Sequence, residues 1–350
     1  MKEGIFRDYY YPELRSAYHK RRSSFEGCVF CIACEILKKH KTPYVVDLSF
    51  TEVYVIKEYG NFILVVNPFP YSNGHCEIVT KRHIKDYMEL REKEIEEITS
   101  LILPQLLNSM EKEYSGRGKF HYNIGLNVGP YSGASMEHLH FHVVPRPKKT
   151  IENVVDIKKY STDTMYRLAK HLYNIDSAKE VLSSHYSFFS KIGCSSCKTG
   201  KMLRSRESPS VIDIGKFWKT RQVYVVKEYE TCFVEVNERG YNSGHVKIVP
   251  KRHVSEYREL KKNEIREIFL AVLPELLDAM KKEYSMKDGS FSYNFGMGTK
   301  NRHLQLELLP RVRSDAGFME TTLSIRVMPE SPKATMERLA KHLFKRKGII

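Results

Sequence analysis

The stretch HLHFHVVPR, which begins at His138, has a histidine at every second position. Side chains of a β-strand alternate between its two faces, so His138, His140 and His142 would share one face and the apolar residues between them the other. A neutral imidazole is a nucleophile near pH 7 and can form a covalent intermediate with phosphorus, which divides one difficult displacement into two steps. The pattern predicts phosphate chemistry on one face and a core on the other.

The segment before these histidines, NVGPYSGASME, is rich in small residues. Gly129 and Gly133 would let backbone amides approach phosphate oxygens, because no side chain would hold the ligand away. The alternative for Gly133 is a plain turn residue. We expect His140 to attack phosphorus, with Ser135 and His142 donating hydrogen bonds to the phosphate and to the leaving oxygen.

Four of the seven cysteines form two C-x-x-C pairs, and each pair has two histidines at matching places downstream. Zinc takes four Cys and His ligands, and four protein ligands close the site to a catalytic water. We therefore predict two structural zinc ions, with a C-x-x-C disulfide or an empty site as the alternatives. The predicted ligands are Cys28, Cys31, His83 and His138 for the first ion, and Cys194, Cys197, His253 and His303 for the second.

The chain repeats itself at an offset of about 170 residues. VYVIKEYGNFILVVN matches VYVVKEYETCFVEVN, and YSNGHCEIVTKRHIKDYMEL matches YNSGHVKIVPKRHVSEYREL. This period is too long for a solenoid unit, so each copy should be a domain with its own core. We expect a first domain at residues 1–185 and a second at residues 186–350.

Within each copy the residue patterns predict an α+β fold. Residues 53–57 and 62–66 read as paired strands around a turn, and GHCEIVT continues the sheet. Residues 90–114 read as an amphipathic helix that Pro104 should kink or break. The expected domain is an antiparallel sheet with a helix across it.

Taken together, these motifs resemble the histidine triad (HIT) family of nucleotide hydrolases and transferases. H-x-H-x-H is preceded by Asn127, Gly129, Gly133 and Ser135, and farther upstream by Asn67, SNGH and KRH. The resemblance covers most of residues 25–150. It implies that Asn67 faces the ribose of a nucleotide and that Asn127 faces its phosphate chain. A turn-capping asparagine is the alternative for Asn67.

Two branches of that superfamily bear on the reaction. GASMEHLHFHVVPR resembles HIT hydrolases and diadenosine tetraphosphate phosphorylases, whereas the duplication and the Cys, Cys, His, His set resemble galactose-1-phosphate uridylyltransferases. In those transferases the third triad residue is a glutamine, whereas here it is His142. The resemblance implies two tandem HIT-like domains forming an intramolecular pseudo-dimer, which could itself form a homodimer.

The second copy of the histidine strand reads HLQLE. His303 keeps the first position, but Gln305 replaces the nucleophile and Glu307 the third histidine, and an amide cannot form the covalent intermediate. The loop before it is also six residues shorter. We expect this copy to have lost catalysis and to keep the fold and the zinc; the alternative is an independent binding module.

Composition limits the remaining function classes. The formal net charge is +15 with 41% hydrophobic residues, and no apolar run is long enough to cross a bilayer. We expect a cytoplasmic protein with no membrane partner. The favoured function is hydrolysis of a nucleoside polyphosphate or phosphoramidate through a nucleotidyl-His140 intermediate. The alternatives are transfer to phosphate or a sugar phosphate, and a basic nucleic-acid-binding module supported by the charge.

Overall fold

The computed structural model describes residues 27–48, 51–114, 120–146, 157–173, 194–203, 209–214, 221–238, 240–298, 303–312 and 331–344. Within these ranges each sequence repeat forms an antiparallel sheet with helices, which confirms the α+β class. No helix in the described ranges is long and apolar enough to span a membrane.

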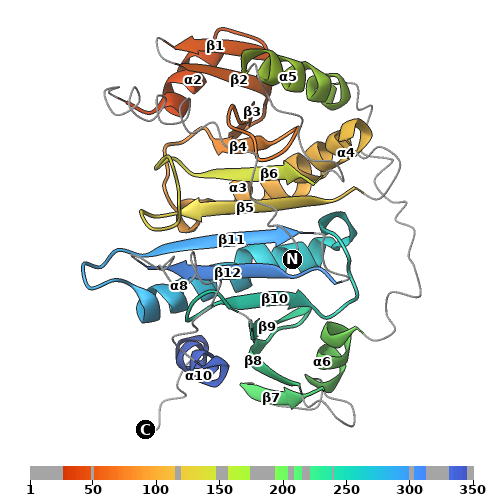
Figure 1. Cartoon of the computed structure of the whole chain (residues 1–350), viewed down its shortest axis with the longest axis vertical. Helices are drawn as coiled ribbons and strands as arrows, with labels where there is room; N and C mark the ends of the chain where they lie inside the picture. The colour runs from red at the N-terminus through yellow and green to blue at the C-terminus, as the bar shows by residue number, and fades with distance from the viewer. Residues whose placement is uncertain are drawn as a thin grey trace, which may run out of the picture. The chain divides into compact units, whose positions relative to one another are not determined.

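The first repeat contributes six strands in the order β1-β2-β3-β4-β6-β5 (Figure 1). The register pairs β4 with β6 from Cys76 opposite Val143 to Val79 opposite His140. Strands β3 and β4 are buried along their whole length, which explains why their sequences FILVV and CEIVT are mostly apolar. The strands are β1 (Tyr44–Leu48), β2 (Thr51–Glu58), β3 (Phe62–Val66), β4 (Cys76–Thr80), β5 (Tyr122–Val128) and β6 (His140–Pro145).

The second repeat builds the same sheet, in the order β7-β8-β9-β10-β12-β11. In both repeats the register shifts once between the second and third strands, at Val55/Lys57 and at Val225/Lys227. The duplication therefore extends to a local irregularity of the sheet. The strands are β7 (Ser210–Asp213), β8 (Gln222–Glu228), β9 (Cys232–Val236), β10 (Val246–Pro250), β11 (Ser292–Gly298) and β12 (Leu306–Arg311).

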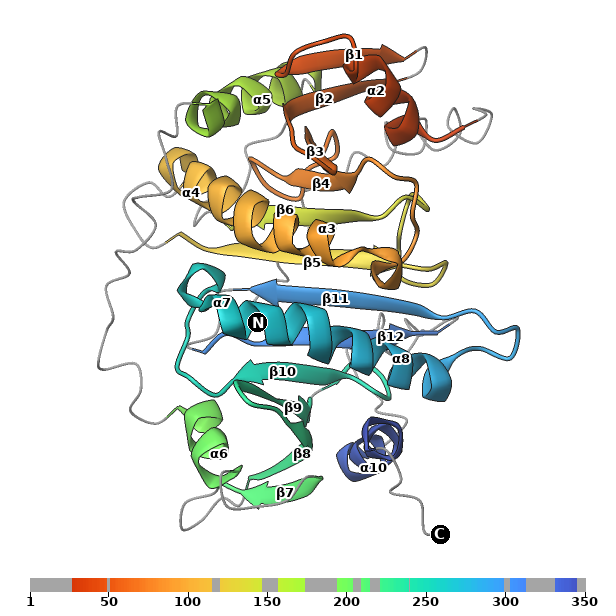
Figure 2. The same ribbon diagram turned by 180° about the vertical axis from the view of Figure 1, so that it is seen from behind.

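The long amphipathic helix is present in both repeats, but proline does not break it. In the first repeat α3 (Glu92–Glu97) passes through a π-helical turn (Ile98–Ile102) into α4 (Leu103–Tyr114). Because the hydrogen-bond pattern already changes at the π turn, the missing N–H of Pro104 leaves the chain helical. Helix α4 runs across the sheet of its repeat (Figure 2).

The corresponding helix of the second repeat has the same three parts, α7 (Lys262–Arg266), a π turn (Glu267–Val272) and α8 (Leu273–Tyr284), and α8 crosses β11 and β12 (Figure 2). A shorter helix carries the C-x-x-C pair in each repeat, namely α2 (Val29–Leu37) and α6 (Ser195–Leu203). The last helices, α5 (Ile157–Tyr173) and α10 (Pro332–Leu343), pack on β2 and on β8 respectively.

The described residues form two compact units that do not follow the repeats. The first unit lies within Met1–Ile84, Glu97–Ile124 and His138–Glu180, and the second within Lys85–Glu96, Gly125–Glu137 and Val181–Ile350. Two segments of the first repeat therefore pack with the second. The predicted boundary between residues 185 and 186 lies outside the described residues and stays a prediction.

Candidate functional site

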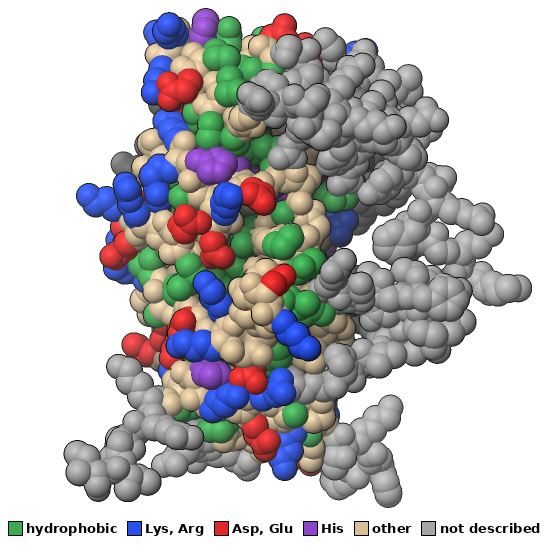
Figure 3. Space-filling view, turned by 90° about the vertical axis from the view of Figure 1, so that its left-hand side faces the viewer, with side chains coloured by type: hydrophobic (Ala, Val, Ile, Leu, Met, Phe, Trp, Pro, Cys, Tyr) green, Lys and Arg blue, Asp and Glu red, His purple; other side chains and the backbone are tan. Residues whose placement is uncertain are grey.

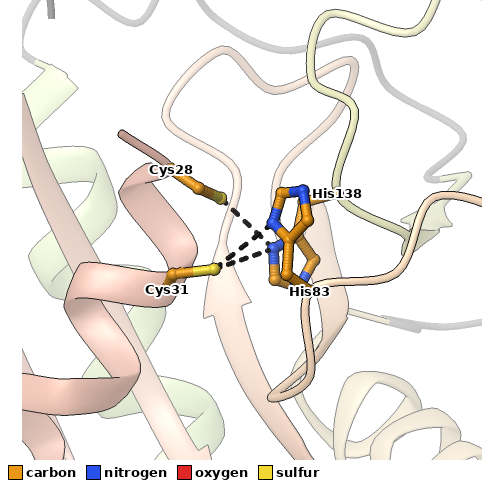
Figure 4. A group of neighbouring side chains, drawn as sticks. All are labelled: Cys28, Cys31, His83 and His138. Carbon is orange, nitrogen blue, oxygen red and sulfur yellow. Dashed lines mark hydrogen bonds between the residues drawn. The ribbon is translucent and has the colours of Figure 1, made fainter. Parts of the chain in front are cut away.

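The four predicted ligands of the first zinc site lie together (Figure 4). Cys28 precedes α2 and Cys31 lies in its first turn, while His83 follows β4 and His138 comes two residues before β6. One donor atom from each lies within 4.8 Å of the others. Cys28 Sγ is 3.2 Å from His138 Nδ1, and Cys31 Sγ is 3.3 Å from His83 Nδ1. Tetrahedral zinc bonds would place sulfur and nitrogen ligands about 3.5 Å apart, so the set fits zinc.

The ring of His138 is held with one nitrogen directed at the cysteines. Its Nε2–H donates to the carbonyl of Thr80 at 2.6 Å, which leaves the lone pair on Nδ1 facing the sulfurs. Burial lowers the pKa of His138 to about 4, so the ring is neutral at pH 7, the form that binds a metal. A carbonyl acceptor on the far nitrogen is the usual support of a zinc-bound histidine.

The second repeat assembles the equivalent cluster. Cys194 Sγ is 3.3 Å from His303 Nδ1, and Cys197 Sγ is 3.2 Å from His253 Nδ1. The Nε2–H of His303 donates to the carbonyl of Pro250 at 2.8 Å, and burial lowers the pKa of this ring to about 4. All seven cysteines of the chain are free, so neither C-x-x-C pair is a disulfide. Both clusters are compatible with zinc.

The proposed nucleophile, His140, is the first residue of β6 and is buried. His138 lies just before the strand because its ring turns to the cysteine cluster, so only two of the three histidines lie along the strand. The Nδ1 of His140 is 2.7 Å from the carbonyl oxygen of His138. A carbonyl only accepts, so Nδ1 carries the proton and Nε2 keeps its lone pair. His140 is thereby fixed in the tautomer of a nucleophile.

His142 lies beside His140, with ring centroids 4.8 Å apart. Its Nδ1 is 3.1 Å from Nε2 of His75, and Nδ1 of His75 accepts the backbone N–H of Tyr71 at 3.2 Å. His75 must therefore carry its proton on Nε2 and donate it to His142, which leaves the remaining proton of His142 on Nε2. Burial lowers the pKa of both rings, that of His75 to about 3, and favours these neutral forms.

Glu77 completes this cluster from β4. Its Oε1 accepts from Nδ2 of Asn67 at 2.6 Å and lies 3.5 Å from Nδ1 of His142. Burial raises the pKa of Glu77 and lowers that of His142, so the contact is not a pair of full charges. His75, Glu77 and His142 also offer three donor atoms to a metal. The proton on His75 Nε2 makes that nitrogen a donor to His142, so we assign no metal here.

Asn67 follows β3, and both ends of its amide make hydrogen bonds within the protein. Its Oδ1 accepts the backbone N–H of Phe69 at 2.7 Å, as a turn-capping asparagine does, while its Nδ2 donates to Glu77. The orientation of the amide is thus fixed by the N–H of Phe69, two residues along the chain. The contact with a ribose stays a prediction.

The predicted phosphate loop belongs to the second compact unit. Asn127 lies on β5, and Gly129 and Gly133 follow with φ of 85° and 82°, a region that favours glycine. A Cβ on Gly129 would lie 2.4 Å from the Oγ of Ser292, whereas a Cβ on Gly133 would meet nothing within 4 Å. Ser135 lies in a bend farther along. Gly129 is therefore required by packing as well as by its backbone conformation.

A family model described as HIT domain matches the segment that carries these histidines, residues 51–149. We refer to residues 51–149 by the description of that model, as the HIT domain. The match includes β2 to β6, and hence His75, Glu77, His140 and His142.

Two curated relatives of this chain have the names of nucleotide-processing enzymes. An AP-4-A phosphorylase of Mycobacterium tuberculosis is 30% identical over 103 residues, which are 29% of this chain and 50% of that protein. This chain thus spans half the length of that relative. An adenosine 5'-monophosphoramidase of Schizosaccharomyces pombe is 28% identical over 119 residues, 34% of this chain and 76% of that protein.

A likeness in fold extends beyond the HIT domain to both repeats. A galt-like protein from Arabidopsis thaliana has a TM-score of 0.55 and covers 90% of this chain and 91% of its own, at 14% identity. At that identity the likeness shows the fold alone, and it confirms the duplicated architecture.

The second repeat has other residues at the positions of His140 and His142, namely Gln305 and Glu307. Gln305 precedes β12 and its Nε2 donates to the Oγ of Ser196 at 3.3 Å. Glu307, in the place of His142, lies 3.5 Å from Nε2 of His245. His245 in turn keeps the backbone contact of His75, since its Nδ1 accepts the N–H of Tyr241 at 3.2 Å. This repeat therefore keeps the backbone contact of His75 and has no histidine in the place of His140.

Two residues of the HIT domain cluster were not predicted from the sequence. His75 ends the motif SNGH, whose counterpart in the second repeat is NSGH, and its recurrence as His245 was the available signal. The comparison of the two repeats could not indicate Glu77, because Lys247 occupies its place in the second repeat.

Proposed function

We propose that the HIT domain cleaves a nucleoside polyphosphate or phosphoramidate at the α-phosphate through a nucleotidyl-His140 intermediate. The observation that carries this proposal is the 2.7 Å contact between Nδ1 of His140 and the carbonyl of His138, which leaves Nε2 as the nucleophile. The names of the two curated relatives support a nucleotide as the substrate.

The reaction has two balanced steps. Nε2 of His140 forms a bond to the α-phosphorus, and the bond from phosphorus to the leaving oxygen or nitrogen breaks. The Nε2–H of His142 donates a hydrogen bond to the leaving atom, which takes its proton from solvent. Water then attacks phosphorus, the bond to His140 breaks, and the proton of that water is released to solvent.

The residues that would bind the nucleotide are assigned from the sequence motifs. We assign the ribose to Asn67 and the phosphate chain to Asn127, Gly129, Gly133 and Ser135. The positive φ of both glycines supports this assignment, since such backbone can turn amides towards an anion.

The two domains have different tasks in this proposal. Residues 1–185 would be catalytic and residues 186–350 would be a scaffold, each with one zinc. The zinc would tie the C-x-x-C helix to the segments that carry the two histidine ligands, and no step of the reaction uses it. The predicted pseudo-dimer belongs to the same proposal.

The test is mass spectrometry of the protein after brief exposure to adenosine, guanosine, uridine and cytidine phosphoramidates and dinucleoside polyphosphates. We expect one nucleotidyl adduct on a peptide that contains His140, and none in His140→Ala. Gln305→Ala is the matched variant from the second repeat and should form the adduct as the wild type does. An adduct that persists in His140→Ala would overturn the proposal.

A phosphorylase is the second candidate, favoured by the name of the Mycobacterium tuberculosis relative. It shares the intermediate but resolves it with phosphate in place of water. Turnover of a dinucleoside polyphosphate without added phosphate supports hydrolysis, and a strict requirement for phosphate supports the phosphorylase.

Nucleic-acid binding receives less support. On the face drawn in Figure 3, Lys and Arg side chains are mixed with Asp and Glu and form no continuous basic tract. Binding of a polynucleotide should weaken steeply with salt if this function is present.

A further inference from the structure

Asn294 of the second repeat contacts the predicted phosphate loop of the first. Both lie in the second compact unit. Its Nδ2 donates to Oδ1 of Asn127 at 2.5 Å and to the carbonyl of Ser132 at 2.9 Å. A further bond joins the loop to the same strand, since the backbone N–H of Tyr131 donates to the Oγ of Ser292 at 3.2 Å. Strand β11 thus holds the loop at three points.

Arg311 decides which way these amides point. Its Nη1 donates to Oδ1 of Asn294 at 2.8 Å, and a guanidinium has no acceptor atom. The oxygen of Asn294 must therefore face Arg311 and its NH₂ group must face the loop. Oδ1 of Asn127 must then be the acceptor. One donor-only side chain in the second repeat fixes two successive amides.

With its oxygen facing Asn294, Asn127 has its NH₂ group left for a ligand. Nδ2 of Asn127 makes no hydrogen bond within the part of the chain that the structure describes, and the residue is partly exposed. Its two N–H groups are donors, which suit phosphate oxygens, whereas the reversed amide would present an acceptor to an anion. We infer that Asn294 is a positioning residue that orients Asn127 for phosphate. This inference rests on the proposed function, in which Asn127 faces the phosphate chain.

The first repeat supplies a matched control. Asn123 occupies the place of Asn294, and with its amide oxygen turned to Arg146 it accepts from Nη2 of that residue at 3.0 Å. Its NH₂ group then donates to the carbonyl of Tyr122 and not to a loop. The Arg–Asn pair is therefore common to both repeats, while the contact with a phosphate loop belongs to Asn294.

The experiment compares the binding of 5'-mononucleotides and of the corresponding nucleosides by calorimetry, for adenine, guanine, uracil and cytosine. In Asn294→Asp the introduced carboxylate accepts from Arg311 but cannot donate, so Asn127 would turn its oxygen to the phosphate. We expect the best-bound mononucleotide to weaken roughly 10- to 100-fold, the loss of a charge-assisted hydrogen bond, while its nucleoside stays within about twofold. Asn294→Ala should weaken the mononucleotide less, and Asn123→Ala should change neither.

Three results would overturn the inference. One is an unchanged mononucleotide affinity in Asn294→Asp and Asn294→Ala. Another is an equal loss for mononucleotide and nucleoside in both variants, which would indicate a damaged fold. If the wild type binds none of the mononucleotides and forms no adduct on His140, the proposed function fails together with the inference. An adduct on His140 without the split between mononucleotide and nucleoside rejects the role of Asn294 alone.

Discussion

Glu77 on β4 is the register partner of His142 on β6, and its Oε1 lies 3.5 Å from Nδ1 of that ring. The equivalent pair in the second repeat is Lys247 opposite Glu307. The acidic residue thus lies on β4 in the first repeat and on β12, the counterpart of β6, in the second, where a lysine takes the place of Glu77. The same backbone register carries Glu77 and His142 in one repeat and a half-buried lysine and glutamate in the other.

Glu77→Lys introduces the residue of the second repeat into the first. We expect the rate of adduct formation on His140 to fall about 100-fold or more, because Asn67 loses its acceptor and an ammonium is buried beside His142. Glu77→Gln keeps an acceptor for Asn67 and should stay within about threefold. Lys247→Glu is the reciprocal control and should leave the rate unchanged. A fully active Glu77→Lys protein would contradict this role.

Elemental analysis should find about two zinc ions per chain. Cys28→Ser and Cys194→Ser should each lose one ion and lower the melting temperature, since the binding energy of a structural metal contributes to folding. Cys34→Ser is the control, because Cys34 lies outside both clusters and should change neither quantity. Zinc-free protein with full stability would reject the assignment.

Stability should depend on pH through His75. Burial lowers its pKa to about 3 in the folded protein, against about 6.5 in the unfolded chain. The unfolded chain then binds more protons between these values. The contribution of the neutral, buried ring to the free energy of unfolding is therefore complete above pH 6.5 and is lost as the pH falls towards 3. It amounts to as much as about 5 kcal/mol. In urea unfolding, the difference in free energy of unfolding between wild type and His75→Gln should be larger at pH 7.5 than at pH 5. A difference that does not change with pH would contradict this role of His75.

Gly129→Ala and Gly133→Ala separate packing from backbone conformation. Both add a Cβ at positive φ, at a cost of about 1–2 kcal/mol. Only Gly129 would also place that Cβ against Ser292 and the carbonyl of Phe291, at 2.4 and 2.6 Å. We expect Gly129→Ala to destabilise by at least about 2 kcal/mol more in chemical unfolding. Equal losses would show that the loop can move away from β11.

The sequence was sufficient for the fold class and for the metal clusters. Strand and helix periods identified most elements, and the repeat showed which cysteines and histidines occur together. The duplicated C-x-x-C pairs and their histidines meet as predicted. A ligand set with strict residue types leaves a strong pattern even in a single chain, because few alternatives satisfy it.

The sequence was insufficient where contacts depend on pairing across the sheet. Glu77 meets His142 only through the register of β4 and β6, and Asn294 reaches Asn127 across more than 160 residues of chain. The π turns before Pro104 and Pro274 were missed because a π turn has no residue pattern of its own. Distances between strands and hydrogen-bond patterns are properties of the folded chain.

His138 serves two centres through two different parts of itself. Its ring lies among the cysteines and His83, while its carbonyl oxygen holds the Nδ1 proton of His140. A chelator or thiol oxidant acting at the cysteines would therefore shift the peptide unit that fixes the proton of the proposed nucleophile, His140. Such a reagent would affect His140 through the backbone of His138, so a bound nucleotide would give no protection against inhibition.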